Sequence, residues 1–368
     1  MTVVNPKVVL VSFSELPTLQ KYMYYTFVEL TKKGISAWTL GSSNVTCGFD
    51  AGDCNILVDT PDSPRPSPAS LIAAVKTADG IARRIAELNP DVVHFVNKHT
   101  WNFFVIRALR KVAPRVKMVH TFHDPVGHSG DAVQKGVVIY HKIVQGMLDG
   151  VVVHSAIAYR QAVEQLKVPC PLNQIPLGEC QERDWNPNSN PKRALIFGRI
   201  NPYKGVAYYP AILRSLAEIA PDIDVVIAGK AAGDLDDSLL AEIAAQPNAN
   251  LINRFIEESE LDGFFADCGV VLMPYASITQ SGVVLDAYSH SRSVVAFDVD
   301  GIDQYVPDVN ELVEPFDCEA YARKVAEVLS NEELLLERNH AAWEFGADKF
   351  SPAVMADGLL CIYRELTR

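Results

Sequence analysis

The feature that most constrains the fold is a regular alternation of short apolar runs with longer amphipathic stretches along the whole chain. The apolar runs have the length of buried strands and include residues 7–13, 91–96, 116–122 and 150–153. Helical periodicity marks the stretches between them, for example residues 18–33 and 100–112. This order predicts an α/β fold in which helices cover parallel sheets.

A chain of 368 residues favours two domains, and the alternation occurs twice. The segment between the two copies is rich in asparagine, proline and mixed charges, which is typical of a linker. We therefore predict an N-terminal domain over residues 1–180, a linker over 181–193, a C-terminal domain over 194–350 and a last helical segment over 351–368.

The connection Phe197-Gly-Arg-Ile-Asn-Pro-Tyr-Lys-Gly205 follows an apolar run and precedes a helical pattern. It holds two cations, Arg199 and Lys204, at the expected carboxyl end of a strand, where open α/β sheets bind ligands. A planar guanidinium and a compact ammonium together suit the oxygens of a diphosphate. The alternative is a solvated loop that happens to contain both cations.

A second motif, residues 279–282 (Thr-Gln-Ser-Gly), follows the apolar run 269–273 and opens another helix. The N–H groups and partial positive charge of a helix N-terminus favour an anion. Asp286 comes one turn later, and a carboxylate so placed can bind ribose hydroxyl groups. The alternative is an ordinary capped helix with Ser281 as the N-cap and Asp286 in solvent.

With these two motifs the chain resembles the retaining glycosyltransferases of family 4, also called glycosyl transferases group 1, in a Gln-Ser-Gly variant of the loop. The resemblance implies the GT-B fold: two Rossmann-like domains that face a central cleft, with the C-terminal helix crossing back to the first domain. It also implies an enzyme that transfers a sugar from a UDP- or GDP-linked donor to a hydroxyl acceptor, in bacterial polysaccharide or glycoconjugate synthesis.

The resemblance assigns roles by position. The catalytic set would be His123, Arg199 and Lys204, with His123 at the end of a strand beside the reacting centre. Asp124 and His128 would bind the acceptor. The leaving phosphate would accept the acceptor's proton on the same face of the sugar. Donor-binding residues would be Arg199, Lys204, Gly229, Arg254, Phe255, Thr279, Gln280, Ser281, Gly282 and Asp286, with the base near residues 254–256.

Several positions depart from the family pattern. Ile278 stands at the first glutamate of its Glu-x₇-Glu motif and Asp286 at the second, while Ser291 and Ser293 replace a glycine and a proline. Two alternatives therefore stay open: a non-catalytic GT-B subunit that activates a partner transferase, and a GT-B sugar-nucleotide epimerase. A Rossmann oxidoreductase is disfavoured because residues 12–16 are not Gly-x-Gly-x-x-Gly.

Composition excludes other classes of protein. Seven cysteines without a Cys-x-x-Cys pair do not form a disulfide framework or a zinc site. The family resemblance implies neither a cofactor nor a metal. The chain has no apolar run of transmembrane length, and its first residues lack the charged region of a signal peptide, which predicts a cytoplasmic protein.

The charge of the chain is unevenly distributed. Residues 1–170 carry 18 Lys and Arg against 13 Asp and Glu, whereas the rest carry 15 against 32, so the halves have net charges of +5 and −17. The basic excess concentrates between Lys98 and Lys117, together with Trp101, Phe103 and Phe104. Such a segment can contact an anionic membrane surface, here the inner face of the cell membrane, or can be a solvated helix face.

This basic segment also suggests a lipid-linked acceptor, with a saccharide as the other acceptor class. The total charge of −12 and the absence of a recognition motif disfavour nucleic acid as a partner.

Overall fold

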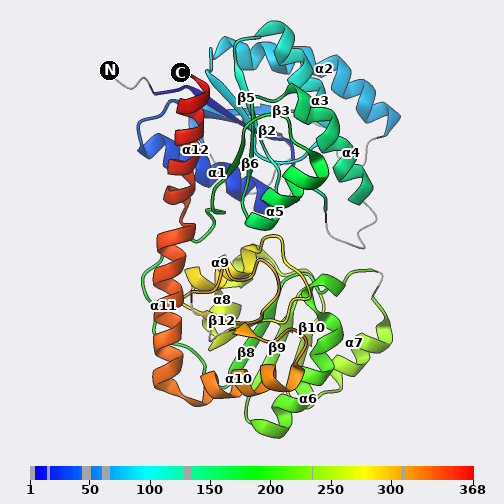
Figure 1. Ribbon diagram of the computed structural model, residues 1–368, viewed down its shortest axis with the longest axis vertical. Helices are drawn as coiled ribbons and strands as arrows, with labels where there is room; N and C mark the ends of the chain where they lie inside the picture. Colours follow the sequence, from blue (N-terminus) through cyan, green and yellow to red (C-terminus); the bar gives the residue numbers. More distant parts are fainter. Residues whose placement is uncertain are drawn as a thin grey trace. The chain divides into compact units, whose positions relative to one another are not determined.

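The computed structural model describes residues 5–14, 17–43, 51–59, 67–127, 134–233, 235–307 and 312–368. Contacts divide the chain into two compact units (Figure 1). Unit 1 comprises Met1–Gly178 and Pro352–Arg368, and unit 2 comprises Glu179–Ser351. In each unit every strand pairing is parallel and helices connect the strands, which confirms the predicted α/β class.

Unit 1 contains a seven-stranded sheet with the order β3-β2-β1-β4-β5-β6-β7. Val8 of β1 pairs with Ala37 of β2 on one side and with Val92 of β4 on the other. The strands are β1 Val8–Ser12, β2 Ala37–Ser42, β3 Asn55–Val58, β4 Val92–Phe95, β5 Lys117–Thr121, β6 Gly150–Val153 and β7 Leu172–Gln174. The helices are α1 Pro17–Lys32, α2 Pro68–Glu87, α3 Thr100–Val112, α4 Gln134–Val144, α5 Ala156–Gln161 and α12 Pro352–Leu366.

Helices cover both faces of this sheet. Side chains alternate along a strand, and Val9 and Val11 of β1 join the core beneath α2 and α3. On the other face α12 packs against α1, and the Tyr363 hydroxyl lies 2.6 Å from Nδ1 of His94 on β4. The predicted return of the C-terminal helix to the first domain is therefore confirmed. Helix α5 continues into one π-helical turn, Ala162–Leu166.

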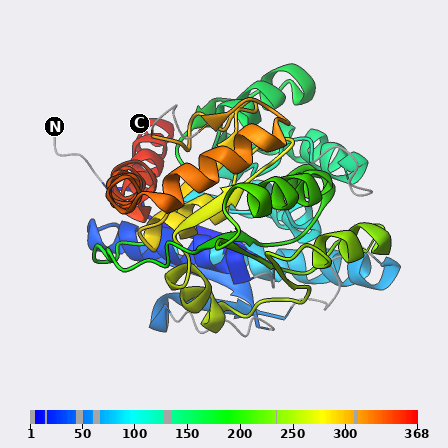
Figure 2. The same cartoon turned by 90° about the horizontal axis from the view of Figure 1, so that it is seen from below.

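Unit 2 contains a six-stranded sheet with the order β10-β9-β8-β11-β12-β13. Its strands are β8 Arg193–Phe197, β9 Asp224–Ala228, β10 Ala249–Ile252, β11 Val270–Met273, β12 Ser293–Phe297 and β13 Leu312–Val313. Its α-helices are α6 Tyr209–Ile219, α7 Asp237–Ala244, α8 Leu261–Ala266, α9 Gly282–Ser289, α10 Cys318–Ser330 and α11 Glu332–Phe350. Helices α6 and α10 lie side by side over one core, and Figure 2 shows α11 end on with α10 extending from it.

The segment predicted as a linker is fixed to unit 2 by side chains at the end of α9 and directly after it. The Ser289 hydroxyl accepts a hydrogen bond from the Gln181 amide at 2.8 Å, and the Ser291 hydroxyl accepts one from the Asn186 amide at 3.1 Å. The buried Arg292 side chain donates to the carbonyl oxygens of Asn186 and Asn188. Ser291 has φ 59°, the left-handed conformation that a glycine at this position would adopt without cost.

Candidate functional site

The order of strands in unit 2 reverses between β8 and β11, since β8 continues to β9 on one side and β11 continues to β12 on the other. Open α/β sheets bind ligands outside the carboxyl ends of the strands at such a reversal. Both sequence motifs lie there, because residues 198–205 follow β8 and residues 274–282 follow β11. The Ala276 amide donates to the Tyr203 carbonyl oxygen at 2.9 Å, which joins the two connections directly.

Two glycines allow this close approach. Gly205 has φ 79°, and a Cβ atom at this position would overlap the carbonyl oxygen of Pro274. Gly198 has φ 91°, and a Cβ atom there would lie 2.6 Å from Nζ of Lys204 and 3.4 Å from Cγ2 of Val283. The missing side chain at position 198 thus leaves room for the Lys204 amine beside the first turn of α9.

Lys204 is the central cation of this site. Its side chain is buried, its Nζ donates to the Phe197 carbonyl oxygen at 3.2 Å, and it lies 5.3 Å from the ring centre of Tyr275. It forms no ion pair with any described residue. Burial is the main cause that lowers the pKa of Lys204, and the neighbouring Arg199 lowers it further. A buried ammonium that forms no ion pair with the described residues favours an anionic ligand.

The N-terminus of α9 faces the same region. Ser281 is the N-cap, as the alternative interpretation of this motif predicted, but its side chain makes no capping hydrogen bond. The side chains of Thr279 and Ser281 are buried, and Oε1 of Gln280 is buried without a hydrogen-bond partner. Asp286 raises the pKa of Lys204, so its carboxylate lies within electrostatic range of the ammonium.

A cavity of about 500 Å³ opens at the carboxyl ends of β9 and β10, lined by Lys230, Asn253, Arg254, Phe255 and Leu240. The ring of Phe255 is 62% exposed, so this surface can stack a planar group. The Arg254 guanidinium donates two hydrogen bonds to the Glu260 carboxylate, at 2.8 and 2.5 Å, which fixes the loop. Gly229 follows β9 directly, and a Cβ atom there would overlap the Gly198 carbonyl oxygen.

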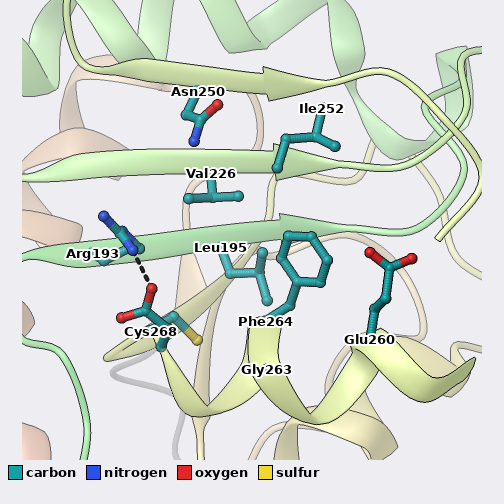
Figure 3. Close-up of a pocket in the computed structure, with 10 residues that line it drawn as sticks. Arg193, Leu195, Val226, Asn250, Ile252, Glu260, Gly263, Phe264 and Cys268 are labelled. Carbon is teal, nitrogen blue, oxygen red and sulfur yellow. Dashed lines mark hydrogen bonds and ion pairs between the residues drawn. The ribbon is translucent and has the colours of Figure 1, made fainter. Parts of the chain in front are cut away.

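A second groove, of about 320 Å³, runs between the sheet and α8 (Figure 3). Leu195, Val226 and Phe264 line its apolar part, and Arg193 at one end is ion-paired with Asp267. None of the predicted donor residues lines this groove, so it is separate from the site at the strand reversal.

In unit 1, His123 follows β5 and is half buried. Its Nε2 lies 2.9 Å from the Val96 carbonyl oxygen. Because a carbonyl oxygen only accepts, Nε2 carries the proton and Nδ1 is left as an acceptor in the neutral ring. The rings of Tyr22 and His154 lie 5.2 and 5.3 Å away and hold the imidazole in place. Asp124 is also half buried, whereas His128 lies outside the described residues.

The other two histidines near this strand are core residues. His94 is fully buried between Tyr363 and Thr121, at 2.6 and 2.8 Å, and burial lowers its pKa to about 3. His120 is fully buried with Nε2 2.8 Å from the Tyr140 hydroxyl. Across the described residues, no three His, Cys, Asp or Glu side chains gather in an arrangement able to hold a metal ion.

Only part of the basic segment, residues 98–117, is exposed at the surface. Trp101 is buried in the core, and Arg110 donates to the Met147 carbonyl oxygen and forms an ion pair with Asp149 at 2.8 Å. Arg107, Lys111 and Arg115 are exposed. No helix in the part of the chain that the structure describes is long and apolar enough to cross a membrane.

One residue of the site was not predicted from the sequence. A Cβ atom on Gly282 would lie 3.2 Å from Oε2 of Glu179, so this carboxylate reaches the first residue of α9. Residue 179 falls in no motif, and more than a hundred residues separate it from the helix. Only the folded chain brings the two together.

Comparison with known proteins identifies the family. The profile of Glycosyl transferases group 1 matches residues 191–331, and that of Glycosyltransferase Family 4 matches residues 19–178. The chain belongs to the family 4 glycosyltransferases. The first of these matches includes both connections of the site in unit 2, so the resemblance inferred from the two motifs is confirmed.

Two named relatives align with part of this family 4 protein. An alpha-D-kanosaminyltransferase from Streptomyces kanamyceticus is 28% identical over 174 residues, which cover 47% of this chain and 45% of the relative. A GDP-mannose:glycolipid 4-beta-D-mannosyltransferase from Xanthomonas campestris pv. campestris is 31% identical over 120 residues, which cover 31% of this chain and 34% of the relative. The alignments thus span less than half of either relative.

Solved structures with the same fold cover nearly the whole chain. A sucrose-phosphate synthase from Thermosynechococcus elongatus has a TM-score of 0.74 at 16% identity and covers 98% of this chain and 99% of its own. A glycosyltransferase from Rickettsia africae has a TM-score of 0.73 at 17% identity and covers 99% of both chains. These similarities show the GT-B fold that the sequence predicted.

Proposed function

We propose that this protein is a retaining glycosyltransferase that moves a sugar from a nucleoside diphosphate sugar to a hydroxyl group. The buried Lys204 ammonium carries the proposal, because it lies at the strand reversal without an ion-pair partner among the described residues. The exposed Arg199 and the start of α9 lie in the same region. Together they suit a diphosphate, whose two phosphoryl groups carry negative charge.

In the proposed transfer reaction, negative charge develops on the departing diphosphate. The bond between the sugar's anomeric carbon and the diphosphate oxygen breaks, while a bond from the same carbon to the acceptor oxygen forms. The acceptor's proton passes to the departing phosphate oxygen on the same face. Arg199, Lys204 and the first N–H groups of α9 stabilise the charge of that phosphate, and one well-placed donor of this kind contributes about 3 kcal/mol. Ile278 is buried and apolar and supplies no nucleophile.

The remaining features are consistent with a nucleotide sugar. The cavity beside Phe255 would take the base and Asp286 the ribose hydroxyl groups. One relative is named for GDP-mannose and a glycolipid, and another transfers kanosamine, an amino sugar. We infer a UDP- or GDP-linked donor and a glycolipid or saccharide acceptor, in the synthesis of a bacterial polysaccharide or glycoconjugate. Neither a cofactor nor a metal is part of this proposal.

A lipid-linked acceptor would place the protein at the inner face of the cell membrane, and unit 1 offers a surface for it. On α4, Ile139 is 58% and Ile143 52% exposed, although the opposite face of the helix already packs in the core. Lys135 and Lys142 lie on the same exposed face. Helix α3 is a neighbour of α4 and exposes further basic residues. An apolar stripe between lysines suits an anionic lipid surface.

One alternative function has specific support. Ile278 replaces a glutamate of the family pattern, and Ser291 and Ser293 replace a glycine and a proline. These losses favour a GT-B subunit that binds a nucleotide sugar without turning it over and activates a partner transferase. The alternative keeps Lys204 and Asp286 as donor ligands and differs from the enzyme only in turnover.

Thermal stability in the presence of UDP, GDP, ADP or TDP tests the proposal. A ligand at 100 times its dissociation constant stabilises by about 2.7 kcal/mol, which shifts the melting temperature measurably. We expect UDP or GDP to stabilise the protein. We also expect the protein to release the same diphosphate from its sugar nucleotide when a membrane extract supplies acceptors. Stabilisation by none of the four would contradict the proposal, and binding without release would favour the non-catalytic subunit.

A further inference from the structure

We propose that Glu179 binds hydroxyl groups of the donated sugar. This inference rests on the proposed function, because it places the sugar of the donor next to the diphosphate site. It gives the proposed donor site a carboxylate, whereas this chain has Ile278 at the position where the family pattern has a glutamate.

The position of Glu179 carries the proposal. Its Oε2 lies 3.2 Å from the point where a Cβ atom of Gly282 would be, at the first residue of α9. The next residue of α9, Val283, lies beside Gly198, against which the Lys204 amine also lies. The carboxylate and the ammonium therefore flank the first turn of the same helix. Gly282 has no side chain to fill the space beside the carboxylate.

The backbone after Glu179 is held firmly. The amide of Cys180 donates to the Phe350 carbonyl oxygen at 3.0 Å, and the amide of Gln181 donates to the Ser289 hydroxyl at 2.8 Å. Cys180 itself is buried beside Gly346, where a Cβ atom would lie 2.8 Å from its sulfur. These bonds tie the two following residues to α9 and α11, so the glutamate side chain starts from a fixed point.

Charge decides which part of the donor this carboxylate meets. A carboxylate repels a diphosphate, whereas it accepts hydrogen bonds from hydroxyl groups, and such charge-assisted bonds are stronger than neutral ones. Lys204 and Arg199 provide the diphosphate side of the site. Glu179 therefore suits the neutral sugar ring, which offers several hydroxyl donors. The competing explanation is that Glu179 only complements the positive end of α9.

Separate affinities for nucleotide and sugar nucleotide distinguish these explanations. Calorimetry would measure the dissociation constants of UDP and UDP-glucose, and of GDP and GDP-mannose, for the wild type and for Glu179→Ala and Glu179→Gln. We expect Glu179→Ala to weaken the sugar nucleotide that the wild type binds by about tenfold to a hundredfold, with the affinity for the bare diphosphate unchanged or higher. Glu179→Gln should keep part of the affinity, because its amide oxygen still accepts. Glu182→Gln changes an exposed neighbour and serves as the control.

Two outcomes would overturn the inference. An equal loss of diphosphate and sugar-nucleotide affinity, with a lower melting temperature, would make Glu179 a structural cap of α9. An unchanged ratio of the two affinities would remove it from the sugar site while leaving the proposed function intact. Failure of the wild type to bind any of the four probes would instead contradict the proposed function and, with it, this assignment.

Discussion

Nζ of Lys204 lies 3.2 Å from the carbonyl oxygen of Phe197, and this backbone oxygen is its hydrogen-bond acceptor. The strand β8 thus supplies the polar partner of the cation that follows it, while no described carboxylate pairs with the ammonium. Taking an ammonium out of water is costly, and one neutral acceptor compensates only part of that cost. Lys204 is consequently a residue whose burial favours ligand binding over the stability of the unliganded chain.

Replacement of Lys204 tests this conflict between stability and binding. We expect Lys204→Met to leave the melting temperature of the unliganded protein unchanged or to raise it, because a buried charge that is only partly compensated is removed. The same variant should lose at least tenfold in affinity for the nucleoside diphosphate. Thermal scans with and without UDP or GDP measure both effects. Lys349→Met, on an exposed position of unit 2, should keep the full ligand shift. A strongly destabilised Lys204→Met would contradict this account.

Gly205 should tolerate no side chain. Its φ of 79° is unfavourable for other residues, and a Cβ atom would overlap the Pro274 carbonyl oxygen. Gly205→Ala should therefore cost at least about 2 kcal/mol in the free energy of unfolding and separate the two connections of the donor site. Gly263→Ala is the matched control, since nothing lies within 4 Å of a Cβ atom there. Equal stability of the two variants in urea unfolding would disprove the close approach.

The strands buried on both faces could be predicted from the sequence, and the contacts of the site could not. Strands such as β1 and β6 are continuous apolar runs because helices cover both faces of the sheet. The edge strand β13 has only two residues and carries no such pattern. Arg199 and Lys204 are close in sequence, so the pairing of these two cations could be predicted from one short motif. The approach of Gly205 to Pro274 and of Glu179 to Gly282 depends on strand order, which one sequence does not reveal.

Asp286 should recognise ribose. Its carboxylate lies near the cation of the diphosphate site, one turn into α9. We expect Asp286→Asn to lower the affinity for UDP or GDP by about tenfold, because a charge-assisted hydrogen bond becomes a neutral one. The affinity for the 2′-deoxy nucleotide should change much less. Competition binding with both nucleotides measures the difference, and an equal loss for both would assign Asp286 to another role.

The buried histidines of unit 1 should make the protein sensitive to acid. Burial lowers the pKa of His94 to about 3 and that of His141 to about 4, both below the ordinary value of 6.5. As the pH falls, these histidines bind protons in the unfolded chain before they do so in the folded protein. They therefore cost no stability above pH 6.5, and the free energy of unfolding decreases as the pH drops from 6.5 toward the pKa values of the folded protein. Each such histidine costs about 1.4 kcal/mol per pH unit in that range.

Urea unfolding at pH 7.5 and 5.5 measures this dependence. His141→Asn should reduce it, since an amide can replace the hydrogen bond to the Pro125 carbonyl oxygen at 2.8 Å without gaining a proton. His340→Asn changes an exposed histidine of unit 2 and serves as the control. If His141→Asn loses as much unfolding free energy between pH 7.5 and 5.5 as the wild type does, His141 does not contribute to the pH dependence.

The surface of α4 should bind anionic membranes. We expect the wild type to sediment with vesicles in proportion to their content of anionic lipid, and to be released as the salt concentration rises. Each basic residue near the surface contributes about 1 kcal/mol, so a few lysines and arginines give weak and reversible binding. The pair Ile139→Ser and Ile143→Ser should reduce binding at all salt concentrations, because the inserted apolar area is lost. Lys135→Ser and Lys142→Ser should reduce it mainly at low salt.

A second exposed apolar pair makes this prediction specific. On α2, Ile72 is 57% and Val75 58% exposed, which is comparable to the pair on α4. Asp79 is also exposed on α2, whereas the exposed face of α4 between Lys135 and Lys142 carries no acid. Charge therefore favours α4 over α2 as the lipid surface. Ile72→Ser with Val75→Ser should leave sedimentation unchanged. If the α2 variant loses binding and the α4 variants keep it, the lipid-binding surface is on α2. If the wild type does not bind at low salt, a soluble acceptor is favoured.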